Sequence, residues 1–143
     1  MKQTEKPCTE STMTFSDNMT EQKRRKIVSL GIYGTKLEFI LTQDIVAHYK
    51  ALCNKYDYLV NEDYIKGKAF AGLHIQLDHH FILIHEDHLS YNTVTHELHH
   101  ACRAINKSIG INDEEADANL CGYLNSEIFK FLNKEKYIIT YGK

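Results

Sequence analysis

Residues 96–100, His96-Glu97-Leu98-His99-His100, place two histidines four positions apart with a glutamate directly after the first. On an α-helix, His96 and His100 would lie about 40° apart around the axis and about 6 Å apart along it, so both imidazoles can bind one metal ion. Glu97 would lie about 60° from His100, where its carboxylate can take a proton from a metal-bound water without being a ligand. The stretch therefore predicts a metal-binding helix in which Glu97 is the general base.

The residues around this stretch repeat with helical spacing. If the helix extends in both directions, a set of apolar side chains falls within about 40° of the side opposite His96. This apolar stripe consists of Val94, Leu98, Ala101, Ile105 and Ile109. His96 and His100 lie on the other face, which indicates that they point away from the core. In a chain with nine histidines, a merely solvated polar face is the alternative.

A second amphipathic helix is predicted to begin at residue 112 or 113, where an Asn or Asp side chain can cap free N–H groups and an acidic first turn suits the helix dipole. Glu115, fifteen residues after His100, falls on the stripe opposite the apolar face of this helix. A catalytic zinc needs three protein ligands and one open position, and two histidines with one glutamate are a known set. We therefore predict one Zn²⁺ per chain, bound by His96, His100 and Glu115. Glu114 is a rival third ligand, about 100° away around the helix.

These motifs resemble those of the gluzincin-type zinc metallopeptidases, in which the first helix is completed by a Glu on a following helix. The segment from His96 to Leu124 is also similar to small metallopeptidase-like proteins of bacteriophages and prophages, and distantly to the ImmA/IrrE-type peptidase domains. The features that carry this resemblance are Glu115-Ala116 and Gly122-Tyr123-Leu124, and it covers about residues 80–125. It implies a zincin-like fold, zinc as the cofactor and a protein or peptide as the substrate. One departure is Asn119, because many gluzincins have at this place an Asp that supports a zinc-binding His.

The composition is typical of one globular domain. The chain has 143 residues, of which 43% are hydrophobic and 25% charged, and a formal net charge of −2. Residues 1–24 have almost no apolar periodicity and are predicted to be a flexible tail, followed by a single domain over residues 25–143. The small net charge gives no reason to expect nucleic acid as a partner, and no apolar run predicts a signal peptide or a membrane span. We expect a cytoplasmic protein, located in the bacterial host if it is phage-encoded.

The remaining segments predict strands and one further helix. Residues 27–33 and 36–41 are β-rich runs that flank Gly34-Thr35 and suggest a hairpin, and a helix is expected from a cap at Thr42 to about Tyr56. Two short strands are predicted at residues 70–77 and 80–85, and residues 137–141 are a last β-prone run. Peptidases of the resembled class have an edge strand just before the metal-binding helix, and an extended substrate pairs with it. We predict that Phe81–His85 is this edge strand, with a plain internal strand as the alternative.

Other chemically active residues give weaker signals. His80, His85 and His88 are candidates for a second metal site, although strand and turn spacing fixes no ligand geometry for them. Asp117 falls inside the apolar arc of the second helix, where a buried acid needs a partner. The four cysteines are widely spaced and are expected to be free thiols. By proximity in sequence, the candidates for an oxyanion-stabilising donor are Tyr91, His99 and Tyr123.

Together these features predict an α+β fold: a small twisted, mostly antiparallel sheet packed on about three helices, forming a minimal zincin-like metallopeptidase domain with the metal between the last two helices. The expected function is a zinc-dependent peptidase that hydrolyses a peptide bond with metal-activated water and Glu97 as the general base. One alternative is a zinc-bound, non-catalytic interaction module on the same scaffold, for example a phage factor that engages a host protein. Glu97 argues against that alternative, because a structural zinc site needs no base. A hydrolase of another bond, or a regulator whose histidines are only polar surface, is the remaining alternative.

Overall fold

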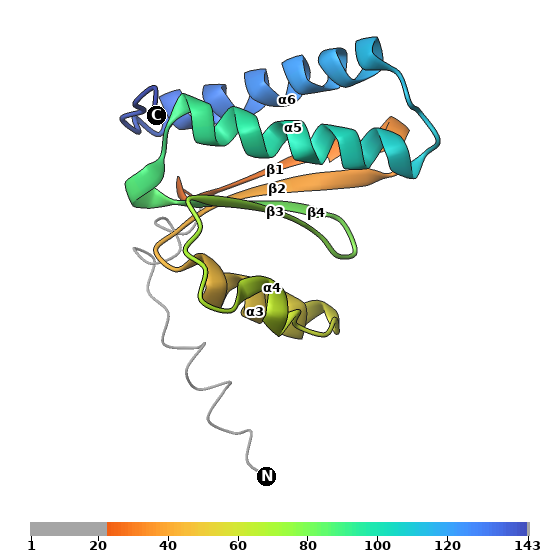
Figure 1. The fold of residues 1–143 in the computed structure, drawn as a ribbon. Helices are drawn as coiled ribbons and strands as arrows, with labels where there is room; N and C mark the ends of the chain where they lie inside the picture. Colours follow the sequence, from red (N-terminus) through yellow and green to blue (C-terminus); the bar gives the residue numbers. More distant parts are fainter. Residues whose placement is uncertain (1–22, 143) are drawn as a thin grey trace, which may run out of the picture.

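A four-stranded sheet with helices on both faces makes up the part of the chain that the structure, a computed structural model, describes, which is residues 23–142 (Figure 1). The expected tail, residues 1–24, lies almost entirely outside the described residues. The strands are β1 (Arg25–Leu30), β2 (Thr35–Thr42), β3 (Gly72–Gln76) and β4 (His80–His85). The helices are α3 (Ile45–Tyr56), α4 (Glu62–Ile65), α5 (Tyr91–Ser108) and α6 (Glu114–Lys134), with 3₁₀ turns η1 (Gly31–Tyr33) and η2 (Glu86–His88).

The sheet is mixed, with strand order β1-β2-β4-β3. β1 and β2 form the predicted antiparallel hairpin, closed by η1 and by Gly34, whose φ of 68° lies in the left-handed region that suits glycine. β2 and β4 are parallel, while β3 and β4 are antiparallel. The predicted α+β class with a mostly antiparallel sheet is therefore confirmed.

β4 is an internal strand, so the prediction that Phe81–His85 forms the edge of the sheet is wrong. β4 pairs with β2 on one side and with β3 on the other, and β3 is the edge. The physical reason is that β4 is covered on both faces. Ile82 and Ile84 face the α5–α6 layer, whereas Phe81 and Leu83 face α3. A strand buried on both faces reads as a continuous apolar run, and this run carries no mark of an edge.

Two hydrophobic clusters join the sheet to its helical layers (Figure 1). One cluster packs the sheet against α5 and α6 and includes Phe39, Leu98 and Leu124. The other packs the opposite face against α3 and includes Tyr49 and Phe81. Because α5 is buried along only one side, its other side is available for chemistry beside the sheet edge.

The ends of the helices correct several details of the sequence reading. The first long helix is capped by Asp44, whose side chain accepts from the N–H of Ala47, and not by Thr42. α4 has no counterpart among the predicted elements, because its single turn is too short to produce a periodic pattern. Residues 137–141 add no strand to the sheet among the described residues; they contribute an isolated bridge between Ser90 and Thr140.

Candidate metal centre

α5 begins where its first N–H groups find acceptors. The side chain of Ser90 accepts from the N–H of Thr93 at 3.0 Å, and the carbonyl of Thr140 accepts from the N–H of Tyr91 at 2.7 Å. The C-terminal segment therefore closes the start of the motif helix.

The predicted apolar stripe of α5 is buried. Val94, Leu98, Ala101 and Ile105 are each 0% exposed. Ile109 differs, because it lies past the end of α5 as the C-cap residue and is exposed. His96 and His100 are both exposed, as the helical spacing predicts.

The two histidines meet at their Nε2 atoms. His96 Nε2 and His100 Nε2 are 3.1 Å apart, and the rings are nearly perpendicular at 84°. Two nitrogens that bind one tetrahedral zinc at about 2.0–2.1 Å are themselves about 3.3 Å apart. The pair therefore fits a single zinc ion with little adjustment.

Glu97 points in a different direction from the two histidines and is only 9% exposed. Its carboxylate accepts a hydrogen bond from the backbone N–H of His74. Burial raises the pKa of Glu97, an effect that the neighbouring His96 and His100 and this hydrogen bond oppose. A carboxylate with a raised proton affinity, next to two histidines that could bind a metal ion, is suited to accept a proton.

Gly72 allows Glu97 to approach the sheet. A Cβ atom at Gly72 would lie 2.9 Å from Glu97 Cγ and 3.0 Å from side-chain atoms of both Ile84 and Thr93. Only a glycine leaves room for α5 to pack this closely on β3.

Two adjoining cavities lie between α5 and the start of β3. A cavity of about 440 Å³ is lined by His74, His96, Glu97 and His100, together with Tyr64 and Phe70. A second cavity of about 260 Å³ shares Phe70, Gly72, His96 and Glu97 with the first. A larger cavity of about 610 Å³ lies against α3, but no residue of the motif lines it. The chemistry of the histidines, and not cavity size, identifies the candidate site.

Glu115 is not brought to the histidine pair. It lies exposed in the first turn of α6. Two residues further along α6, Asp117 contacts Arg103 and Asn106, each at 2.7 Å. Because α5 and α6 run antiparallel (Figure 1), Glu115 is level with about residue 107, roughly 10 Å along α5 from His100. Among residues 23–142, no group of three or more His, Cys, Asp and Glu side chains is positioned to hold a metal ion.

The predicted partner of Asp117 is present. The Arg103 guanidinium and the Asn106 amide donate to its carboxylate, and these hydrogen bonds hold the pKa of Asp117 below its ordinary value. Because this contact joins the last turns of α5 to the first turn of α6, it sets the level at which the two helices meet. Asp117 therefore has a structural role, and it also keeps the start of α6 away from His96.

His74 and His80 are two functional candidates that helical spacing does not reveal. They come from neighbouring strands, and His74 Nε2 lies 3.1 Å from His80 Nδ1 with the rings stacked at an interplanar angle of 6°. Burial lowers the pKa of His74 to about 4, and the nearby His80 and His100 add to this effect. The pairing register between residues 72–76 and 80–84 would have revealed this contact, but the register itself is not visible in the sequence.

These two histidines predict a pH-dependent stability for the metal-free protein. The pKa of His74 is about 4 in the folded state, against an ordinary value of 6.5, and burial also lowers the pKa of His80. Between these values the unfolded chain binds protons that the folded chain does not, so the free energy of unfolding falls as the pH decreases. For His74 the loss begins near pH 6.5, is complete near pH 4 and amounts to at most about 3 kcal/mol.

Urea denaturation in the presence of a chelator, from about pH 7 to about pH 4.5, measures this dependence. We expect His74→Gln to lose less stability than the wild type across the same range. Carboxylates such as Asp117 titrate equally in both proteins and cancel in the comparison. Identical pH profiles for the two proteins would contradict the burial assigned to His74.

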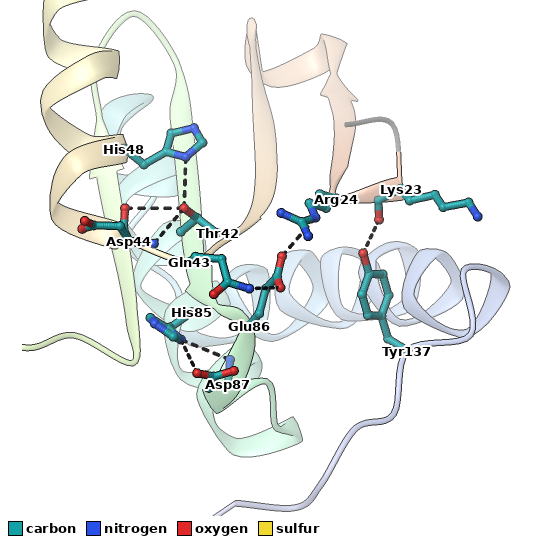
Figure 2. Close-up of polar contacts among 10 residues, drawn as sticks. All are labelled: Lys23, Arg24, Thr42, Gln43, Asp44, His48, His85, Glu86, Asp87 and Tyr137. Carbon is teal, nitrogen blue, oxygen red and sulfur yellow. Dashed lines mark hydrogen bonds and ion pairs between the residues drawn. The ribbon is translucent and has the colours of Figure 1, made fainter. Parts of the chain in front are cut away.

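The three histidines considered for a second metal site are not brought together. One of them, His85, belongs to the polar network drawn in Figure 2. Alternation along β4 puts His80 on the face of α5 and His85 on the opposite face. His85 Nδ1 instead accepts from the N–H of Asp87 and caps η2, and its ring lies 5.3 Å from that of His88. The adjacent Glu86 binds Gln43 and Arg24. This network fastens η2 to the residue before β1 and to the residue after β2, which is a structural role.

Other candidates from the sequence lie away from the two cavities. Within the described residues, Tyr91, His99 and Tyr123 line neither cavity, whereas Tyr64 lines the larger of the two. Cys53, Cys102 and Cys121 are free thiols as predicted, and Cys8 lies outside the described residues. Burial raises the pKa of the Cys102 thiol, so it is an unreactive core side chain.

The fold and the site can be compared with known proteins. Searches of protein-family models, of curated proteins and of solved structures each found no match to this chain. Over residues 23–142, no helix is both long enough and apolar enough to cross a membrane. The functional interpretation therefore depends on the geometry of the site.

Proposed function

We propose that this chain is a zinc-dependent peptidase of the zincin-like type, acting in the cytoplasm, in which His96 and His100 hold the metal and Glu97 is the general base. The observation that carries the proposal is the 3.1 Å separation of His96 Nε2 and His100 Nε2. It is joined by a buried carboxylate, Glu97, that lines the same cavity. A polar helix face with no chemical role gives no reason for this combination.

Each residue has a defined role in this proposal. Zinc, when bound, would lower the pKa of a water molecule and polarise a peptide carbonyl. Glu97 would accept the proton of that water and return it to the leaving amine. The hydrogen bond from the His74 N–H holds the carboxylate in place while it does so. Tyr64, which lines the cavity, is within the site and is our candidate for the donor to the oxyanion.

The edge strand β3 offers a binding site for an extended peptide. His85 N–H donates to Ala71 O and Leu77 N–H donates to His79 O, both at 2.9 Å, and these bonds set the alternation of the β3–β4 ladder. The backbone groups of Gly72, His74 and Gln76 consequently point away from β4. Because the N–H of His74 already donates to the Glu97 carboxylate, a substrate strand could pair with the remaining groups there, alongside the cavities lined by His96 and Glu97. The role predicted for Phe81–His85 thus passes to β3.

Metal content of the purified protein tests the proposal. We expect close to one zinc per chain, measured by mass spectrometry, in wild type and in Glu97→Gln prepared without added metal. His96→Ala should lose the metal, because a single remaining imidazole of the pair cannot hold the ion. Circular dichroism should show that this variant keeps its helices, since His96 is exposed. A wild-type protein that binds no zinc would overturn the proposed function.

A further inference from the structure

We propose that His74 of β3 is the third protein ligand of the metal, in the place that the sequence assigned to Glu115. This inference rests on the metal site proposed at His96 and His100. It goes beyond that site because it names a ligand from the sheet, outside both helices of the motif, and a residue that orients it.

The first argument is position. Side chains alternate along a strand, so His74 lies on the same face of β3 as Gly72, which packs directly against Glu97 of α5. His74 lines the cavity of about 440 Å³ together with His96 and His100. As they stand, the three rings are not placed to hold a metal ion, so the ion would have to draw them together. Glu115, by contrast, lies at the far end of α5 and lines neither cavity.

The second argument is chemical. Three histidines with an open fourth position are a known ligand set for catalytic zinc. A ligating histidine commonly uses its other ring nitrogen to donate a hydrogen bond, which fixes its tautomer and the direction of its lone pair. His80 can supply this support, because its Nδ1 lies 3.1 Å from His74 Nε2. With the proton on Nε2, the Nδ1 atom of His74 keeps its lone pair for the metal.

The third argument is rigidity of the support. His80 is 2% exposed and belongs to β4, which is paired on both sides. A histidine held by such a partner has few orientations, whereas an exposed Glu115 in the first turn of α6 has many. A ligand from β3 would also tie the metal to the strand on which we expect the substrate to bind.

Titration of the metal-free protein with Co²⁺ tests this assignment, because the absorption of bound cobalt reports the number and type of its ligands. We expect wild type and Glu115→Ala to bind one Co²⁺ with equal affinity and the same spectrum. His74→Ala should bind at least about 10- to 100-fold more weakly, and His80→Ala should show a smaller loss in the same direction. Circular dichroism of each metal-free variant checks that the fold is kept.

A cysteine at position 74 gives a direct readout. In His74→Cys, a ligating thiolate should add an intense sulfur-to-cobalt charge-transfer band, which we expect the wild type to lack. Equal Co²⁺ binding by His74→Ala and wild type, or a His74→Cys protein without this band, would overturn the inference and leave the His96–His100 site standing. Loss of binding in Glu115→Ala alone would return the third position to Glu115. A wild type that binds no Co²⁺ or Zn²⁺ would instead remove the proposed function itself.

Discussion

Glu97→Gln should hydrolyse peptides about 10²- to 10⁴-fold more slowly than wild type while it binds zinc with unchanged stoichiometry. The amide keeps the size of the side chain and its ability to accept the hydrogen bond from the His74 N–H. It cannot take a proton from water, so only the chemical step is lost. Because Glu97 is only 9% exposed, a base from the buffer cannot reach this position and take over its role.

Turnover of an unstructured protein substrate, such as casein, or of a fluorogenic peptide library measures this effect with the zinc-loaded protein. A matched control is Glu127→Gln on α6, which replaces a carboxylate that pairs with Lys130 at 3.4 Å and lines neither cavity. The control should keep wild-type turnover. If Glu97→Gln were as active as the control, Glu97 would not be the general base. A zinc-loaded wild type with no activity on any peptide would favour the non-catalytic interaction module.

The motif helix could be predicted from the sequence because every signal for it is local. The four-residue spacing of His96 and His100 and the apolar stripe that includes Leu98 depend only on helical geometry. Nothing outside the helix is needed to bring the two Nε2 atoms to 3.1 Å. The strands and the hairpin at Gly34 are local for the same reason.

The third ligand is not a local property. The periodicity of α6 gives the face on which Glu115 lies, but not the level at which that face meets α5. That level is set by the short connection after Ser108 and by the contact of Asp117 with Asn106. Helical periodicity tells on which side of α6 a residue lies, whereas the geometry of the α5–α6 hairpin determines how far along α5 it lies. A prediction based on periodicity alone therefore cannot place Glu115 along α5.

The order of the strands is also beyond a local reading. Residues 80–85 were predicted as a strand, and they are one, but their internal place depends on the parallel pairing with β2, more than 40 residues earlier. The same pairing makes β3 the edge and brings His74 to α5. The residues most relevant to the site are therefore those whose neighbours come from distant parts of the chain.

Phe81→Ala should lower the free energy of unfolding by about 3–5 kcal/mol. Phe81 is 0% exposed and belongs to the cluster between the sheet and α3. Its ring is 5.6 Å from that of Tyr56 and 4.3 Å from that of His79, measured between centroids. Removing the ring forfeits its transfer free energy and leaves a cavity, because β4 is held by neighbours on both sides and cannot collapse into the space.

Urea denaturation measures this loss as a lower midpoint with an unchanged slope. Ile138→Ala is a suitable control, since Ile138 is 88% exposed and its truncation should change the free energy of unfolding by less than about 0.5 kcal/mol. Phe81 faces α3, while the histidine pair lies on α5 across the sheet. The variant should therefore still bind metal under conditions in which it remains folded. A loss below about 1 kcal/mol would mean that α3 does not pack on β4 as described. A loss of metal binding in the folded variant would mean that the two sides of the sheet are coupled, and that the position of β3 beside α5 depends on the core beneath it.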